Sequence, residues 1–391
     1  MLKPAARLGQ LPPYLFAELD RRREAARARG LDVIDLGIGD PDRPTPAPVV
    51  ERLRREAADP RHHRYPAYQG ASLFREAVAD YYRRRFGVDL DPEREVLAVI
   101  GSKEGIAHLI WAWVDPGDPV LVPDPAYPVY RAHTILAGGR PVPMPLLAER
   151  DFFPDLAAIP REVREQSRLM FLNYPNNPTA GVATAEQLGE AVDFARQHNI
   201  LLCHDAAYVE MTYTGTSAPS VLQIPGAKEV AVEFYSLSKP FNMTGWRIGA
   251  AVGNAVAVAA LGRIKNNTDS GQFTAVQYAA VEALTWPGGP DFIREMNAVY
   301  RRRRDLAVAR LTRSGWDLRV PAGTFYLWAR PPGVRDSGSF AAELLERTGV
   351  SVAPGPAYGS QGEGYIRLSL CCEEARLVEA LDRIASAAGR F

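Results

Sequence analysis

The segment Ser236-Leu237-Ser238-Lys239-Pro240-Phe241-Asn242-Met243-Thr244-Gly245-Trp246-Arg247-Ile248-Gly249 places one lysine beside a Ser-x-Ser pair and eight residues before an arginine. A lysine amine can form an imine with an aldehyde, and hydroxyl and guanidinium groups suit a phosphate dianion. A residue before proline favours extended geometry, so Lys239 is predicted to lie in a loop after the preceding apolar stretch. The segment therefore predicts a site for a phosphorylated aldehyde, and pyridoxal 5'-phosphate (PLP) is the common cofactor of that kind.

Lysine is scarce in this chain, which narrows the search for an imine-forming residue. Only five of the 46 basic residues are lysines, and a guanidinium stays protonated and does not form a Schiff base under ordinary conditions. Lys3 is terminal, Lys228 follows a turn and Lys265 closes a helical pattern. Of the remaining two, Lys103 and Lys239, we predict that Lys239 forms the imine.

Bulk composition limits the classes of protein that fit. The chain has 391 residues, 47% of them hydrophobic, and a formal net charge of zero. That length suits one large domain plus a smaller one, and the neutral charge favours neither nucleic acid nor a membrane surface as partner. No apolar run is long enough to predict a membrane span. The three cysteines form no disulfide framework, which favours a reducing, cytoplasmic location.

The spacing of apolar runs predicts the secondary structure. Between about residues 95 and 285 short runs alternate with helical patterns, which is typical of a parallel sheet with crossover helices. We expect strands at residues 96–100, 120–123, 169–173, 200–204, 230–235 and 248–252. A Trp-Pro-Gly-Gly-Pro break at 286–290 precedes a long helix at 291–314, whose arginine run at 301–304 is interpreted as a solvated face.

The chain is expected to fold as an α/β protein with two domains. After the long helix, the order strand, helix, strand, helix indicates a separate α+β unit, and a helix at 15–29 is expected to pack with it. The predicted boundaries are an N-terminal segment at 1–40, a large cofactor-binding domain at 41–286 and a small domain at 287–391.

Polar side chains follow several of the predicted strands. Asp205 suits the protonated pyridine nitrogen of PLP, Tyr208 and Asn177 suit its ring oxygen, and Tyr127 suits its face. Each taken alone is equally an ordinary turn residue. Ligands of open α/β sheets gather at the carboxyl ends of strands, however, and several strand ends here direct polar groups to one place.

Two further positions suit anions. Ser102 and Lys103 open a helix after a strand, where backbone N–H groups and the helix dipole favour a phosphate, although Ser102 is equally a plain N-cap. Arg367 lies among alternating apolar residues and is either the polar face of an edge strand or a bidentate clamp for a substrate carboxylate. The histidines show no metal-ligand spacing with carboxylates or cysteines, and no metal is predicted.

Taken together, these motifs resemble those of class I/II (fold type I) aminotransferases, most closely the LL-diaminopimelate aminotransferase group. The resemblance covers nearly the whole chain and includes the segments at 11–16, 36–42, 65–70 and 100–108 besides the loops already described. It implies a large domain with a mostly parallel central sheet flanked by helices, and a smaller α+β domain built from both ends of the chain. It also implies PLP, amino acid and 2-oxo acid substrates, and a homodimer with shared active sites.

The resemblance also implies a role for each matched residue. Lys239 would bind PLP and act as the base, with Asp205 and Tyr208 as further catalytic groups. The remaining cofactor contacts would be Ser102, Lys103, Tyr127, Asn177, Ser236, Ser238 and Arg247, with Tyr65 and Asn267 reaching the neighbouring subunit's site. Substrate contacts would be Tyr14, Gly39, Asn177 and Arg367.

Several alternatives stay open at this point. Pro240-Phe241 stands where relatives tend to have Thr-Tyr, and Cys371-Cys372-Glu373 where they tend to have Thr-Val-Pro. Transfer between LL-2,6-diaminopimelate and 2-oxoglutarate is favoured, but an aspartate, alanine, methionine or aromatic aminotransferase, or a PLP β-lyase, would share the same machinery. A PLP-binding regulatory module lacks room for a DNA-binding segment before Leu11. A nicotinamide-dependent dehydrogenase lacks the G-x-G-x-x-G motif after a first strand.

Overall fold

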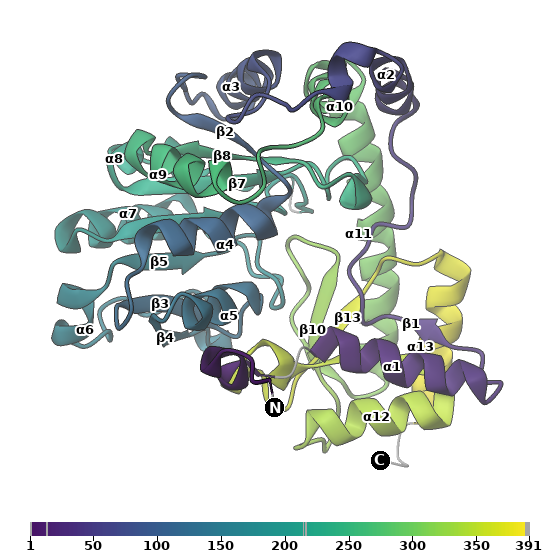
Figure 1. Cartoon of the computed structure of the whole chain (residues 1–391). Helices are drawn as coiled ribbons and strands as arrows, with labels where there is room; N and C mark the ends of the chain where they lie inside the picture. Colours follow the sequence, from purple (N-terminus) through teal and green to yellow (C-terminus); the bar gives the residue numbers. More distant parts are fainter. Residues whose placement is uncertain (1, 13–14, 214, 216, 388–391) are drawn as a thin grey trace.

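A seven-stranded sheet forms the centre of the computed structural model, which describes residues 2–12, 15–213, 215 and 217–387. The strand order is β2-β8-β7-β6-β5-β3-β4 (Figure 1). β8 runs antiparallel to both of its neighbours, and the other neighbouring pairs are parallel. The strands are β2 (Val96–Val99), β3 (Pro119–Asp124), β4 (Arg140–Pro145), β5 (Leu169–Leu172), β6 (Leu201–Asp205), β7 (Ala231–Ser236) and β8 (Gly249–Gly253).

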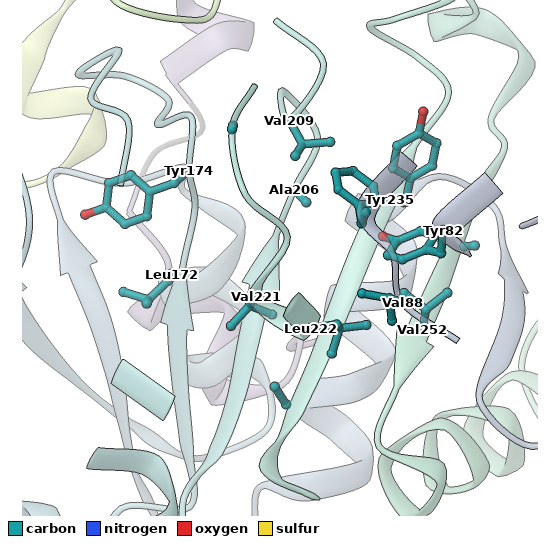
Figure 2. Close-up of a cluster of buried hydrophobic side chains, with 14 of the residues drawn as sticks. Tyr82, Val88, Leu172, Tyr174, Ala206, Val209, Val221, Leu222, Tyr235 and Val252 are labelled. Atoms are coloured by element: carbon teal, nitrogen blue, oxygen red, sulfur yellow. The ribbon is translucent and has the colours of Figure 1, made fainter. Parts of the chain in front are cut away.

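Helices cover both faces of this sheet because the inner strands carry apolar side chains on both of their faces. One face packs against α4 (Ser102–Trp113), α5 (Val129–Leu136) and α9 (Ala255–Asn266). The other packs against α3 (Ser72–Phe86), α7 (Ala185–His198) and α10 (Thr274–Thr285). Figure 2 shows part of this second core, where Tyr82 of α3 meets Tyr235 of β7 with ring centroids 6.0 Å apart. Shorter helices are α2 (Ala47–Ala57), α6 (Arg161–Gln166) and α8 (Ala227–Val230).

Local sequence signals account for several helix ends. Thr184 caps α7 through a capping box with Gln187, and the helix ends at Asn199 in the left-handed conformation. Helix α3 ends at Gly87, whose φ of 67° is unfavourable for residues with a side chain. These signals fix where α3 and α7 stop and the loops to the next strands begin.

Both ends of the chain build a second, smaller unit. Its antiparallel sheet has the order β12-β13-β10-β9, and β1 pairs in parallel with β11. Figure 1 shows α11 (Gly289–Arg313) running from the large sheet into this unit, where α1 (Leu15–Ala28), α12 (Ser337–Thr348) and α13 (Glu374–Ala387) gather. The strands are β1 (Ile34–Asp35), β9 (Asp317–Leu318), β10 (Tyr326–Arg330), β11 (Val350–Ser351), β12 (Ala353–Pro354) and β13 (Ile366–Ser369).

The predicted α/β fold is confirmed, with each of the six expected strands and the long helix present. Strand β4 was not predicted, because its sequence Arg-Pro-Val-Pro-Met-Pro has three prolines that cannot donate to a ladder. It is tolerated because β4 lies at the edge of the sheet.

The interpretation of the arginine run as a solvated face is wrong for two of its members. Arg303 and Arg304 are buried. Arg303 donates to both carboxylate oxygens of Asp42 at 2.8 Å, and Arg304 donates to Pro321 O at 2.8 Å. Long side chains with a charged end can thus be drawn inward where buried acceptors exist, which helical periodicity alone does not reveal.

Candidate active site

One cavity of about 360 Å³ lies at the carboxyl ends of the parallel strands, between the large sheet and the smaller unit. It collects side chains from segments far apart in the sequence, which is where open α/β sheets bind ligands. Twelve of the predicted site residues line it: Gly39, Ser102, Lys103, Tyr127, Asn177, Asp205, Tyr208, Ser236, Ser238, Lys239, Arg247 and Arg367. Ile38, Asn173, Ala207, Thr244 and Tyr326 complete the lining.

Lys239 lies just beyond β7 with its amine inside the cavity. Burial lowers the pKa of this amine to about 8, and the nearby Cys371 and Asp40 oppose that shift. Nζ donates to the carbonyl oxygen of Gly39 at 3.0 Å. The amine is therefore partly neutral near physiological pH, as a nucleophile or base requires.

Asp205 is the last residue of β6, and its two carboxylate oxygens differ in hydrogen bonding. Oδ2 accepts a hydrogen bond from the hydroxyl of Tyr130 at 2.7 Å, and the Tyr130 ring stacks on Phe171 with centroids 4.8 Å apart. Oδ1 is buried and has no hydrogen-bond partner among the described residues. Burial raises the pKa of Asp205, and the Tyr130 hydrogen bond opposes this. A protonated ring nitrogen would satisfy Oδ1 and restore the carboxylate.

Arg367 forms a pair with Asn177 across the cavity. Nη1 donates to Asn177 Oδ1 at 2.8 Å, and Nη2 donates to Gly37 O at 2.6 Å. This leaves the Asn177 side chain with its NH₂ group as the available donor. Arg367 is 2% exposed and belongs to an inner strand, which excludes the solvated edge-strand alternative.

A polar cradle forms where α4 begins. Gly101 has a φ of 78°, and a Cβ there would lie 2.5 Å from Nη2 of Arg247, so glycine permits the guanidinium to approach the helix N-terminus. Ser102 Oγ is buried without a hydrogen-bond partner in the described part of the chain. Ser236 Oγ accepts from the backbone N–H of Ser238 at 3.2 Å. Hydroxyls, a guanidinium and a helix N-terminus together suit a phosphate dianion.

Two predicted site residues lie elsewhere. Tyr65 is 90% exposed, and Asn267 is exposed at the end of α9. Both are outside the cavity in a single chain. Tyr14 lies outside the described residues.

Two residues that line or support the cavity were missed by the sequence reasoning. Tyr130 follows Tyr127 by three residues and lies in the first turn of α5. Its closeness to Tyr127 along the chain is the only feature of the sequence that could have pointed to it. Tyr326 lies in an apolar strand, β10, with no local motif to distinguish it from core. Its hydroxyl is 3.0 Å from that of Tyr208, and its ring lies 4.1 Å from the Arg367 guanidinium carbon.

The unusual residues next to the site do not line the cavity. Phe241 is 1% exposed and packs in the large core, and Cys371 is partly buried, with its sulfur 3.9 Å from the Tyr300 hydroxyl. Burial raises the pKa of the Cys371 thiol to about 12, so it is a neutral packing group.

Lys265 lies in the last turn of α9, as its position in the sequence predicted. It is 1% exposed, and Nζ contacts Glu104 at 3.0 Å and Asp269 at 2.9 Å. Glu104, His108 and Asp269 each offer a ligand atom, all within 4.8 Å of one another. The Lys265 ammonium already compensates the carboxylate charge there, and the absence of a metal stays a prediction.

Comparison with known proteins shows what these features have in common. A family model described as aminotransferase class I and II matches residues 31–384. The chain belongs to this family. It is 54% identical to an LL-diaminopimelate aminotransferase of Desulforudis audaxviator, covering 99% of this chain and 98% of the relative. It is 53% identical to one from Moorella thermoacetica, covering 100% and 99%.

Solved structures agree with the fold. Substrate-bound BacF from Bacillus subtilis superposes with a TM-score of 0.96 at 36% identity, covering 99% of this chain and 98% of that one. A mutant of Thermus thermophilus aspartate aminotransferase gives 0.93 at 32% identity, covering 99% and 100%.

The cofactor of this aminotransferase is PLP, and the cavity fits it. Asp205 Oδ1 and Ser102 Oγ are buried polar atoms without partners among the described residues, at positions suited to a ring nitrogen and a phosphate. Gly101 leaves room beside Arg247 that a side chain would fill.

No described helix is both long and apolar enough to cross a membrane.

Proposed function

We propose that the protein transfers an amino group between LL-2,6-diaminopimelate and 2-oxoglutarate. The observation that carries this proposal is the full-length similarity, at 48–54% identity, to enzymes named LL-diaminopimelate aminotransferase. The cavity independently supports PLP chemistry on an amino acid, because it combines a buried lysine of lowered pKa with an arginine suited to an α-carboxylate.

PLP, when bound, supplies an aldehyde carbon that joins to an amino group and a ring that withdraws electrons from it. Lys239 would attach the cofactor and, once displaced by the substrate, would carry a proton to and from the substrate's α-carbon. Asp205 would face the ring nitrogen and keep it protonated. Asn177 and Tyr208 would donate to the ring oxygen. A positioned general base of this kind contributes roughly 10²–10⁴-fold to rate.

The remaining lining residues would hold the two anionic ends of the bound molecules. Arg367 would take the α-carboxylate in a bidentate contact, next to Gly39 and Asn177. Tyr127 would pack on the ring face. The phosphate contacts would be Ser102, Lys103, Ser236, Ser238 and Arg247, all of which line the cavity.

In a homodimer with shared sites, Tyr65 and Asn267 would contribute to the active site of the neighbouring subunit. Gly271 packs against Pro66 and Ala67, so the segments that carry Tyr65 and Asn267 lie close together on the surface. Tyr65, Tyr68 and Phe273 are large exposed aromatic side chains in this area. Exposed aromatics that gather in one place favour a protein interface. From it, Tyr65 and Asn267 would reach the partner's phosphate site.

The division at residues 1–40, 41–286 and 287–391 and a cytoplasmic location are part of the same proposal. The division is supported by the strands of the seven-stranded sheet, which all fall within residues 41–286, and by those of the four-stranded sheet, which all fall within 287–391. All three cysteines are free, which supports a reducing compartment.

The substrate assignment is tested by steady-state assays of the PLP-loaded enzyme with a panel of amino donors and 2-oxoglutarate. We expect LL-2,6-diaminopimelate to give the highest kcat/KM and glutamate to form in equal amounts with the consumed donor. A higher kcat/KM for aspartate, alanine, methionine or an aromatic amino acid would show that this amino acid, and not LL-2,6-diaminopimelate, is the preferred donor. Release of pyruvate and ammonia without amino transfer would show a β-lyase instead. A Lys239→Ala variant should lose nearly all turnover with every donor.

A further inference from the structure

Tyr326 occupies a position between two functional parts of the cavity. It is 3% exposed and belongs to β10, the strand that pairs with the Arg367 strand β13. Its ring and its hydroxyl face different partners. A Cβ at Gly39 would overlap the Tyr326 hydroxyl, so the loop of Gly39 approaches this side chain closely only because it lacks a side chain there.

The ring of Tyr326 supports the arginine. The Arg367 guanidinium carbon lies 4.1 Å from the Tyr326 ring centroid and 4.8 Å from that of Tyr358. A guanidinium next to aromatic faces gains cation–π attraction, which is larger when the pair is desolvated. The two rings therefore limit the orientations of the fork that faces the cavity.

The hydroxyl of Tyr326 has a separate partner, the Tyr208 hydroxyl at 3.0 Å. Either oxygen can donate while the cavity holds no acceptor. A tyrosine hydroxyl has one proton, so if Tyr208 donates to the cofactor's ring oxygen, the bond between the tyrosines must run from Tyr326 to Tyr208. Burial raises the pKa of both tyrosines, so both keep their protons in the working pH range. Donors in such a chain polarise and strengthen one another.

We propose that Tyr326 is a positioning residue that orients the Arg367 carboxylate clamp with its ring and the Tyr208 hydroxyl with its own hydroxyl. The inference rests on the proposed function, because it takes Tyr208 to donate to the ring oxygen of PLP. It links substrate binding and cofactor electronics through one side chain.

Two readouts separate the two contributions. The first is the pH midpoint at which the visible absorbance of bound PLP changes, and the second is KM for the amino donor. A donor to the ring oxygen stabilises the more negatively charged, high-pH form and so lowers the midpoint. Tyr326→Phe keeps the ring and should raise the midpoint by about 0.5–1 pH unit, with KM within about twofold of wild type.

Three further single variants and one double variant complete the test. Tyr326→Leu should raise the midpoint similarly and also raise KM about 5–10-fold. Tyr358→Leu removes the other ring next to Arg367, together with its edge contact to Trp328, but leaves the Tyr208–Tyr326 hydrogen bond in place, so it should raise KM without moving the midpoint. Tyr208→Phe should raise the midpoint at least as much as Tyr326→Phe, and the double variant should add nothing, since both changes interrupt one chain.

An unchanged midpoint in Tyr326→Phe, or additive shifts in the double variant, would overturn the hydroxyl role. An unchanged KM in Tyr326→Leu would overturn the ring role. These failures are distinct from failure of the proposed function, in which the wild-type enzyme would itself show no amino transfer from LL-2,6-diaminopimelate to 2-oxoglutarate.

Discussion

At the scale of single residues, the proposed attachment of PLP to Lys239 predicts how the rate of cofactor capture depends on pH. Burial lowers the pKa of this amine to about 8, and only the neutral amine attacks an aldehyde. Below that pH the amine is mostly protonated, so the capture rate should rise as pH increases and level off above about 8. Stopped-flow absorbance after mixing the apoprotein with PLP between pH 6.5 and 9.5 measures this. A midpoint near the ordinary lysine value of about 10.5 would contradict it.

The hydrogen bond between Tyr130 and Asp205 leads to a second prediction at this scale. Tyr130→Phe removes the donor that opposes the burial-induced rise in the Asp205 pKa, so this pKa should rise further. Because the carboxylate must be ionised to hold a protonated ring nitrogen, PLP affinity should fall about tenfold at neutral pH. It should fall still more as pH decreases, as fluorescence titration would show.

A matched control exists on the opposite face of the sheet. Tyr82 also donates to a buried carboxylate, that of Glu233, at 2.7 Å, but neither residue lines the cavity. Tyr82→Phe should therefore leave PLP affinity unchanged. Equal losses in both variants would mean that general destabilisation, and not the orientation of Asp205, caused the effect.

The same residues show what sequence can and cannot reveal. Lys239, Asp205, Asn177 and Arg367 were found because each follows or lies in a strand and has a chemistry that few other roles require. Tyr130 and Tyr326 were missed because a buried tyrosine has the same sequence signature whether its hydroxyl meets a catalytic group or ordinary core. Only three-dimensional proximity distinguishes the two.

At the scale of secondary-structure elements, an ion pair connects helix α11 to the loop that borders the site. Arg303 of this helix binds Asp42, three residues beyond Gly39 in the chain, and also donates to Leu370 O at the end of β13 at 3.0 Å. Periodicity predicted α11 well because its length and apolar spacing are local properties. Its inward arginine was not predictable, because the acceptors come from segments more than 60 residues away.

Loss of this partly buried ion pair should destabilise the protein. Asp42→Ala leaves the 5%-exposed Arg303 without its carboxylate and should lower the free energy of unfolding by about 3 kcal/mol. Urea denaturation of the apoprotein measures this. Glu374→Ala removes the exposed partner of Arg302 in the same helix and should cost under about 1 kcal/mol. Similar losses of stability in both variants would contradict the claim that the burial of Arg303 makes its ion pair more stabilising than the exposed pair of Arg302.

At the scale of the whole molecule, the proposed dimer predicts that each active site needs residues from two chains. Lys239→Ala and Tyr65→Ala subunits, mixed and reassembled, should form hybrids with one intact site. Random pairing gives about a quarter of the wild-type activity, well above that of either parent. No gain on mixing, with hybrids verified by differently tagged subunits, would mean that Tyr65 does not act across the interface.

The most direct test of the central claim is a single half-reaction without an acceptor. The PLP-loaded enzyme is mixed with excess LL-2,6-diaminopimelate, and cofactor absorbance and product are followed. We predict one change of the cofactor band, one equivalent of oxo-acid product per site, which is expected to cyclise, and no free ammonia. After the excess donor has been removed by gel filtration, addition of 2-oxoglutarate should restore the band and yield one equivalent of glutamate per site. Continuous product and ammonia release without acceptor, or an unchanged band, would contradict amino transfer from this donor.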